Sequence, residues 1–319
     1  MAVLVGIDEA GFGPILGPLV VSSSSFLLPH HLLGADLWQI LRKSVGNKRK
    51  RLGGRLLITD SKKAYSKSLG IKHLERTVLA AYRCLGRNPA TLTELIALLC
   101  PDCLDRLRDY PWYRDAENHR VLADEADKAI ASTVLADDMA SNGIKLLELR
   151  SCCLDVGYYN KMMSSVRNKA SVLFTATSQL IKNAFDSASG NDLQIMVDRQ
   201  GGRVHYRKNL QRMFPDMELK ILHESTASSS YELRAGSKPM RLHFVIDADE
   251  RFLPVSLASM VSKYLRELLI QSMNRYFASF GADLRPTAGY WKDGLRFIKD
   301  LESQIPHVEY NSNQLIRCR

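Results

Sequence analysis

Two adjacent acidic residues near the start of the chain are the residues best placed to do chemistry. Asp8 and Glu9 follow a short apolar run from Val3 to Ile7, and a turn rich in glycine and proline comes directly after them. Carboxylates at the end of a buried strand are unfavourable unless they are paired or bind a cation. Neighbouring strand residues point to opposite faces, but a turn that starts at Gly11 can redirect the second acid. The pair therefore indicates a cation-binding site, with a solvated acidic turn as the alternative.

The complete run of residues 6–18 is more specific than the acidic pair. It resembles the N-terminal signature of the ribonuclease HII (type 2 ribonuclease H) family, in which Asp-Glu-Ala-Gly is followed by Arg-Gly-Pro. Phe12 stands where that family usually has arginine. In the family this loop presents backbone groups to the ribose 2′-hydroxyl, which distinguishes RNA from DNA. The matching positions are Asp8, Glu9, Ala10, Gly11, Gly13, Pro14, Gly17 and Pro18.

Two further segments resemble the same family. Asp60-Ser61-Lys62-Lys63 matches its Asp-Ser-Lys-Lys run, and the two lysines could contact phosphate as point charges. Asp198 ends the apolar run from Leu193 to Val197, where the family places its third catalytic aspartate. Taken alone, two adjacent lysines are most often solvent-exposed surface residues, and an aspartate at the end of a strand is a common turn former. Their order in the chain favours the functional interpretation.

The segment from Asp247 to Glu267 resembles a family stretch that runs from Gly-Asp through a helix of small residues to Arg-Asp. Ser259, Lys263 and Glu267 are spaced by four and share one helix face. The resemblance places Glu267 at the family's fourth catalytic aspartate, and Asp249 is the alternative fourth ligand. A solvated helix face with a Lys-Glu pair is the simpler interpretation. The other matching positions are Ala248, Ala258 and Arg266.

A final landmark lies near the C-terminus. Gly289-Tyr290 resembles the family's Gly-Tyr, whose tyrosine packs against the deoxyribose after the ribonucleotide. A core tyrosine is the alternative. The five landmarks together imply a site that holds Mg²⁺ or Mn²⁺ with oxygen ligands. The implied catalytic and metal-ligating residues are Asp8, Glu9, Asp198 and Glu267, and the implied nucleic-acid contacts are Gly11, Phe12, Gly13, Lys62, Lys63, Ser259, Lys263 and Tyr290.

Short apolar runs alternate with helical patterns along the chain, which predicts an α/β fold. The resemblance specifies a ribonuclease H-like mixed sheet flanked by helices, with helical insertions. We expect a catalytic domain over residues 1–280, insertions at about 27–55 and 86–142, and a C-terminal extension over 281–319. The predicted strands are Val3 to Ile7, Leu56 to Ile58, Ile144 to Leu149, Leu193 to Val197, Leu219 to Leu222 and Leu242 to Ile246.

Composition limits the classes of function. The 319 residues carry a formal net charge of +10, which suits a polyanionic partner such as nucleic acid. No run is long enough to cross a bilayer and no secretory signal is visible, so we expect a cytoplasmic protein with no membrane partner, and a monomer by default. Cys100-Pro-Asp-Cys103 and Cys152-Cys153 could form a zinc site, but reduced thiols are the favoured interpretation.

These observations favour a metal-dependent endoribonuclease. The resemblance implies that it cuts the RNA strand of RNA–DNA hybrids, or a ribonucleotide embedded in duplex DNA. Two alternatives remain at this point. The chain could be a non-catalytic nucleic-acid-binding protein that retains the fold. Phe12 and Glu267 support this alternative, because both depart from the family at functional positions. It could also be a ribonuclease H-like nuclease that acts on DNA junctions with the same acids.

Overall fold

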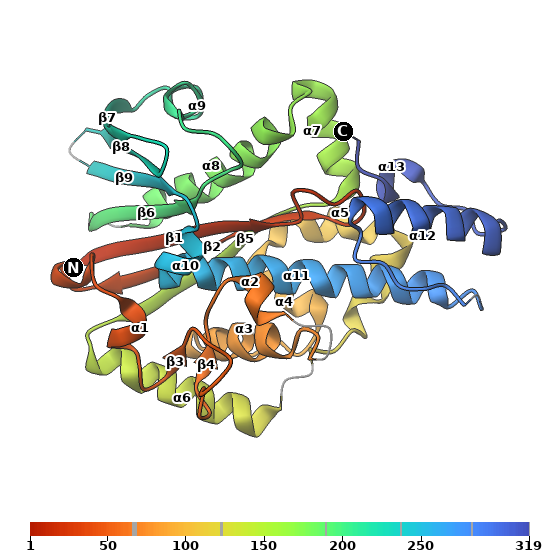
Figure 1. Cartoon of the computed structure of the whole chain (residues 1–319), viewed down its shortest axis with the longest axis horizontal. Helices are drawn as coiled ribbons and strands as arrows, with labels where there is room; N and C mark the ends of the chain where they lie inside the picture. Colours follow the sequence, from red (N-terminus) through yellow and green to blue (C-terminus); the bar gives the residue numbers. More distant parts are fainter. Residues whose placement is uncertain (66–68, 122–123, 189, 237, 282, 319) are drawn as a thin grey trace.

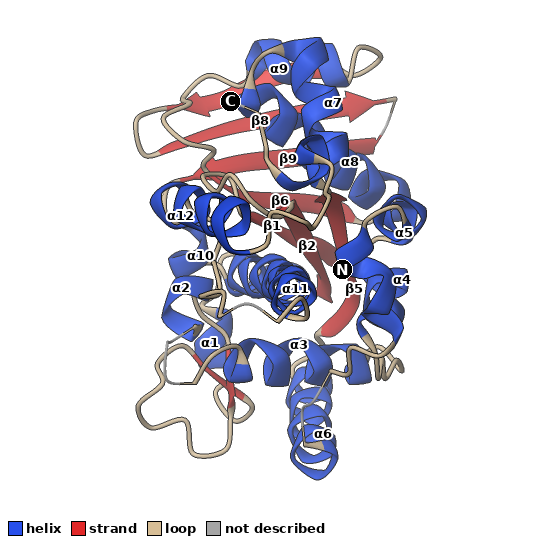
Figure 2. Cartoon of the chain, turned by 90° about the vertical axis from the view of Figure 1, so that its right-hand side faces the viewer, coloured by secondary structure: helices blue, strands red, loops and turns tan. Residues whose placement is uncertain are grey.

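A mixed β-sheet forms the centre of the molecule (Figures 1 and 2). The computed structural model describes residues 1–65, 69–121, 124–188, 190–236, 238–281 and 283–318. Over these residues the sheet has seven strands in the order β5-β2-β1-β6-β9-β8-β7, and a separate two-stranded sheet pairs β3 with β4. The strands are β1 (Ala2–Ala10), β2 (Leu19–Leu28), β3 (Val45–Gly46), β4 (Leu56–Leu57), β5 (Lys145–Leu154), β6 (Asp192–Asp198), β7 (Glu218–Glu224), β8 (Ser228–Ala235) and β9 (Lys238–Val245).

Strand directions follow a simple pattern. β1, β6 and β9 run parallel to one another, β2 runs antiparallel between β1 and β5, and the β7–β8 hairpin extends the β9 edge. The carboxyl ends of β1, β6 and β9 therefore meet at one edge of the sheet. This mixed sheet flanked by helices confirms the predicted α/β class.

Helices cover both faces of the sheet, with α11 on one face and α7 and α8 on the other (Figures 1 and 2). The α-helices are α1 (Leu37–Ile40), α2 (Ser61–Ala64), α3 (Lys72–Cys84), α4 (Leu92–Leu99), α5 (Leu104–Arg108), α6 (Glu125–Ser141), α7 (Val156–Val166), α8 (Lys169–Ser187), α9 (Arg207–Met213), α10 (Ala248–Arg251), α11 (Leu253–Ala278), α12 (Trp291–Gln304) and α13 (Ser312–Leu315). Three 3₁₀ turns, His30–Leu32, Pro101–Cys103 and Pro111–Glu117, complete the elements of the described residues. None of the helices in this part of the chain is long and apolar enough to span a membrane.

The first strand sits between two hydrophobic clusters. Leu4 packs on the α11 side, whereas Val3, Val5 and Ile7 pack on the α8 side, as the alternation of a strand requires. Gly6 lets α11 approach the strand closely, because a Cβ there would lie 2.1 Å from the backbone carbon of Pro254. The α11 helix thus begins directly against β1, next to the acidic end of that strand.

The structure corrects part of the predicted element list. β2 was absent from it, because Ser22 to Ser25 make this strand look polar. In the fold these serines are buried and hydrogen-bonded: Ser22 Oγ lies 2.7 Å from Ser151 Oγ, and Ser24 Oγ donates to Pro254 O at 2.7 Å. The hairpin strand β8 was missed as well. The predicted strand at Leu56 to Ile58 exists, but it pairs with β3 outside the main sheet.

The predicted insertions and C-terminal extension contribute to the core. The end of β2 lies inside the expected insertion 27–55, whereas 86–142 is helical as expected, with residues 122 and 123 outside the described part. Phe297 and Leu315 of the extension are buried in the same hydrophobic cluster as α11. Residues 282 and 319 of the extension also lie outside the described part. The domain boundary at residue 280 stays a prediction.

Candidate active site

The parallel strands bring acidic residues from distant parts of the sequence to one edge of the sheet. Ile7 of β1 pairs with Val197 of β6, so the next residues, Asp8 and Asp198, lie on neighbouring strands just beyond the point where this pairing ends. Asp198 in turn pairs with Val245, the last residue of β9. The chain then turns into α10, whose first turn carries Asp249. The carboxyl edge of a parallel sheet is the usual location of ligand sites in α/β proteins.

Hydrogen bonds fix the strand-end acids in place. Asp8 Oδ1 accepts from the Glu9 backbone N–H at 2.7 Å, and Asp198 Oδ1 accepts from Ala248 N–H at 2.8 Å. Ser262 Oγ on α11 donates to the carbonyl of Asp8 at 3.0 Å. α11 therefore holds the end of β1, and the start of α10 holds the end of β6.

The acids raise one another's pKa values. Burial raises the pKa of Asp8 well above its ordinary value, and the charges of Glu9, Asp198 and Asp249 raise it further. Burial followed by the charge of Asp198 raises the pKa of Glu9 to about 7, against a partial opposing effect of Lys62. Burial also raises the pKa of Asp198, although the hydrogen bond that its carboxylate accepts from the Ala248 backbone lowers that pKa. Such coupled shifts mark an excess of negative charge.

Asp249 belongs to this group, and Asp60 adjoins it. Burial and then the charge of Asp60 raise the pKa of Asp249 to about 7, and the two side chains are hydrogen-bonded. Asp60 is buried and caps α2 by accepting from the backbone N–H of Lys62 at 2.9 Å. Burial lowers the pKa of Lys62, but the charges of Asp60, Asp249 and Asp8 outweigh that effect and raise it. Lys62 thus lies close to the acids.

Glu267 lies in a different environment. Its buried carboxylate pairs with Lys263 Nζ at 2.6 Å and with Arg266 Nη1 at 3.5 Å. It is eight residues along α11 from Ser259, which is about 12 Å at 1.5 Å per residue. Ser259 hydrogen-bonds Asp8, whereas Glu267 contributes, after burial, to the raised pKa of Tyr65. The structure therefore brings Asp249, rather than Glu267, together with Asp8, Glu9 and Asp198.

The carboxylate group suits a hard divalent cation by its chemistry. Its donors are oxygen atoms, and a cation would offset the repulsion that raises their pKa values. Among the described residues, no three histidine, cysteine, aspartate or glutamate side chains are arranged to hold a metal ion as they stand. The acids would therefore have to converge on an ion that binds between them.

The predicted nucleic-acid contacts occupy several positions. Lys62 and Lys63 are exposed on α2, and Lys63 Nζ pairs with Glu250 at 2.6 Å. Ser259 is buried, and its Oγ lies at hydrogen-bond distance, 3.0 Å, from Ser61 Oγ. Lys263 pairs with Glu267, as described above. Tyr290 is 50% exposed at the start of α12. Ser259 and Lys263 are thus engaged within the protein, whereas Lys62 and Tyr290 face outward.

The glycine loop after β1 rests on buried Arg266, a matching position to which the sequence analysis gave no role. Gly11 has a φ of +93°, and a Cβ there would lie 2.7 Å from Nε of Arg266. The Nη2 of this arginine donates to the carbonyls of Leu16 at 3.3 Å and Ala288 at 2.9 Å. Its Cζ lies 5.6 Å from the ring centroid of Tyr290. Arg266 therefore links the loop after the acids to the tyrosine segment.

Phe12 and Gly13 face away from that arginine. Phe12 is half-buried against the α8-side cluster, and Lys169 Nζ lies 5.2 Å from the centroid of its ring. Gly13 is exposed, and a Cβ there would meet no atom within 4 Å. The position that is arginine in the resembled family is thus an aromatic contact in this chain.

The cysteines form a second compact cluster. Cys103 Sγ lies 3.2 Å from Cys100 Sγ, and both thiols are hydrogen-bonded to that of Cys153. All six cysteines are free, as the reduced-thiol interpretation predicts. Within the described residues the cluster is not arranged to hold a metal ion.

The chain is similar to solved structures rather than to family models or curated proteins. No protein-family model matches the chain, and no curated protein matches it. Among solved structures, 27 chains match. They include ribonuclease HII of Archaeoglobus fulgidus in a complex with PCNA, which is 15% identical with a TM-score of 0.47, over 99% of this chain and 94% of that one.

Two other similar structures carry related names. Bst-RNase HIII in complex with Mn²⁺ is 14% identical with a TM-score of 0.45, over 93% of this chain and 62% of that one. Aquifex aeolicus RNase H3 is 15% identical with a TM-score of 0.46, over 98% of this chain and 71% of that one. These names belong to the ribonuclease H enzymes that the sequence motifs resemble.

Proposed function

We propose that the chain is a divalent-metal-dependent endonuclease that hydrolyses the RNA strand of RNA–DNA hybrids or a ribonucleotide embedded in duplex DNA. The observation that carries this proposal is the group formed by Asp8, Glu9, Asp198 and Asp249 at the carboxyl edge of the sheet, where burial and then the charges of neighbouring acids raise the pKa of each carboxyl group. Structural ion networks seldom leave this much like charge uncompensated, whereas sites for phosphoryl chemistry need it.

The residues of the chain have distinct roles in this proposal. Asp8, Glu9, Asp198 and Asp249 would hold Mg²⁺ or Mn²⁺, which supplies charge stabilisation at the phosphate and lowers the pKa of bound water. Asp249 takes the position that the resemblance gave to Glu267. In the metal-free protein Glu9 has a pKa of about 7 and so exchanges its proton near neutral pH. Ser259 keeps the Asp8 carboxylate oriented from α11.

Substrate contacts in this proposal surround the acids. Lys62 would neutralise phosphate charge beside them. The glycine loop would approach the ribose, because Gly13 leaves its backbone open to a ligand. The exposed ring of Tyr290, held near Arg266, would pack on the sugar that follows the ribonucleotide, as the family resemblance implies.

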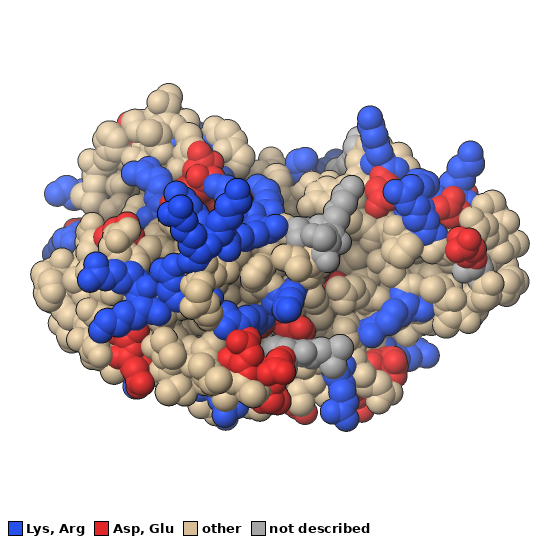
Figure 3. Space-filling view, turned by 60° about the horizontal axis from the view of Figure 1, so that its bottom comes forward, with Lys and Arg blue, Asp and Glu red and all other residues tan. Residues whose placement is uncertain are grey.

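A basic surface extends from the site. The loop between β3 and β4 exposes Lys48, Arg49, Lys50 and Arg51, and Arg49 donates to the carbonyl of Tyr65 at the end of α2. In Figure 3, which brings this side of the molecule forward, Lys and Arg side chains gather in the left half of the view. We assign this loop to the nucleic-acid backbone, because exposed cations next to Lys62 add to the electrostatic attraction.

A cleavage panel tests the proposal and separates the alternatives. The purified chain is incubated with an RNA–DNA hybrid, a DNA duplex containing one ribonucleotide, an all-DNA duplex and a four-way DNA junction, each with Mg²⁺, Mn²⁺ or EDTA. We expect metal-dependent cleavage of the first two substrates only. Cleavage of the junction would identify a junction nuclease instead. Binding of the hybrid without cleavage under any metal condition would identify a non-catalytic binding protein.

A further inference from the structure

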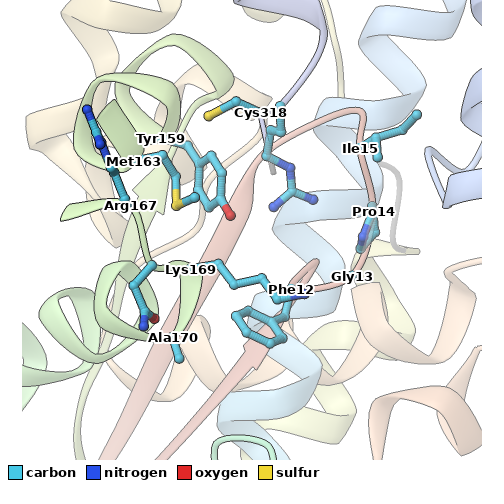
Figure 4. A pocket seen from close by; sticks show the side chains of 12 residues that line it. Phe12, Gly13, Pro14, Ile15, Tyr159, Met163, Arg167, Lys169, Ala170 and Cys318 are labelled. Atoms are coloured by element: carbon cyan, nitrogen blue, oxygen red, sulfur yellow. The ribbon is translucent and has the colours of Figure 1, made fainter. Parts of the chain in front are cut away.

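A cavity beside the glycine loop is lined by cations, and none of the described residues that line it is acidic. Its volume is about 690 Å³. Three segments form its walls: the loop after β1, the turn between α7 and α8, and the C-terminal end of the described chain (Figure 4). The lining residues are Phe12, Gly13, Pro14, Ile15, Tyr159, Met163, Arg167, Asn168, Lys169, Ala170, Arg317 and Cys318. We call this space the Arg317 cavity.

Arg317 is the unusual residue of this cavity. Its side chain is 4% exposed, and none of its three guanidinium nitrogens has a hydrogen-bond partner within the described part of the chain. Burial, and then the positive charge of Arg266, lower its pKa to about 9. A buried charge without a partner strongly destabilises a fold unless something pairs with it. Because Arg317 lines the cavity, a pairing group can reach it from that side.

The backbone holds Arg317 in place. Its N–H donates to the carbonyl of Ile15 at 2.8 Å, and the neighbouring Ile316 forms a bridge with Leu16. On the other side, the N–H of Cys318 donates to Oδ1 of Asn160 on α7 at 2.8 Å. The guanidinium also lies 5.1 Å from the centroid of the Tyr159 ring. A segment fixed on both sides presents its charge in one position, as a binding site requires.

A helix N-terminus faces the same space. α8 spans 19 residues, and Lys169 and Ala170 of its first turn line the cavity. The Asn168 side chain accepts from the N–H of Ser171 at 3.1 Å, and the first N–H groups of a helix otherwise lack intrahelical partners. The positive end of the helix dipole therefore adds to the charges of Arg317 and Lys169. Figure 4 shows the Lys169 side chain extending toward Phe12 across the cavity.

We propose that the Arg317 cavity binds a phosphate group, paired with the Arg317 guanidinium and held by the first turn of α8. Resting on the function proposed above, the bound group is a backbone phosphate of the nucleic-acid duplex. Gly13 at the cavity wall is four positions along the chain from Glu9, a span of at most about 14 Å. One strand of duplex DNA advances about 3.4 Å per nucleotide, so the phosphate lies within about four nucleotides of the cut.

Inorganic phosphate serves as the first probe. Thermal unfolding is measured in phosphate and in chloride at equal ionic strength for the parent, Arg317→Met and Lys220→Met, a control at an exposed position on the far edge strand β7. We expect phosphate to raise the Tm of the parent and of the control, and not that of Arg317→Met. In chloride, Arg317→Met should be at least as stable as the parent. No rise in the parent, or an equal rise in Arg317→Met, would overturn the proposal.

A second variant keeps the test decisive if Arg317→Met does not fold. Ala170→Asp adds a negative charge in the first turn of α8, where it suits the helix dipole but repels an anion. We expect it to fold and to lose the phosphate-dependent rise in Tm, and an undiminished rise would contradict the proposed position.

Binding of the duplex tests whether the phosphate group belongs to the nucleic-acid backbone. In EDTA, the slope of log binding constant against log salt should be shallower by about 0.9 in Ala170→Asp than in the parent, with Lys220→Met unchanged. An unchanged slope together with an intact phosphate effect on Tm would refute the backbone assignment. If the parent does not cleave any substrate of the panel, the proposed nuclease activity is refuted. The effect of phosphate on Tm then still decides whether the Arg317 cavity binds phosphate.

Discussion

Replacing Glu9 by glutamine should make the metal-free protein more stable at alkaline pH. The folded-state pKa of Glu9, about 7, lies above its ordinary value of 4.5, so folding favours the protonated carboxyl. Its contribution to stability is full below pH 4.5 and is lost as pH rises through 7. Glutamine resembles the protonated form at every pH. The variant should therefore match the parent at pH 4.5 and exceed it at pH 8.

The size of the effect follows from the two pKa values. The difference between about 7 and 4.5 corresponds to about 3 kcal/mol. For a chain of this length, about 3 kcal/mol is a rise of about 4–5 °C in Tm. This figure is an upper bound, because Glu9 is only half-buried and neighbouring acids share the repulsion.

Thermal unfolding in EDTA at pH 4.5 and pH 8, for the parent and Glu9→Gln, measures this difference. Adding Mg²⁺ should then raise the Tm of the parent more at pH 8 than at pH 4.5, because protons compete with the cation for the carboxylates. The rise should be smaller in Glu9→Gln. A variant that is no more stable than the parent at pH 8 would refute the claim that burial and the neighbouring charges disfavour the ionised Glu9 carboxylate.

Four other substitutions test the site and its loop. Asp8→Asn and Asp198→Asn should each abolish cleavage yet leave duplex binding in EDTA nearly intact, and near-normal turnover in either would remove these residues from the metal site. Phe12→Arg should tighten duplex binding by about 1 kcal/mol through a charge-assisted contact with phosphate, whereas unchanged or weaker binding would mean that the ring is structural. Gly11→Ala should lower stability by about 2 kcal/mol or more, because φ is +93° and its Cβ would lie 2.6 Å from Pro18 O. The control Gly13→Ala, whose Cβ meets no atom within 4 Å, should change stability little, and equal losses in denaturant unfolding would contradict that reason.

The acids at strand ends could be predicted from the sequence, because short apolar runs that end in a carboxylate are visible without a structure. Asp8 follows such a run near the end of β1, and Asp198 is the last residue of β6. The fourth acid was harder to choose. Asp249 and Glu267 both lie in a segment that resembles the family, and only the pairing of β9 with β6 and the length of α11 show which one joins the others.

Other features depend on tertiary contacts that no local pattern records. The four serines of β2 look like a loop, and only their partners on β5 and α11 explain why they are buried. Arg317 follows the last of the resembled motifs. Its role depends on a backbone bridge to Leu16 and on the distant N-terminus of α8. Spacing along the sequence could not predict either contact.

Single-turnover cleavage by Asp249→Asn and Glu267→Gln, side by side, tests the composition of the acidic site most directly. Both are measured with excess enzyme on a DNA duplex containing one ribonucleotide, in Mg²⁺, against the parent. We expect Asp249→Asn to lose cleavage almost completely, because it removes a carboxylate whose charge contributes to the raised pKa values of Asp8 and Glu9. Glu267→Gln should retain much more activity, because its partners are Lys263 and Arg266. Parent-like cleavage by Asp249→Asn together with an inactive Glu267→Gln would contradict the account.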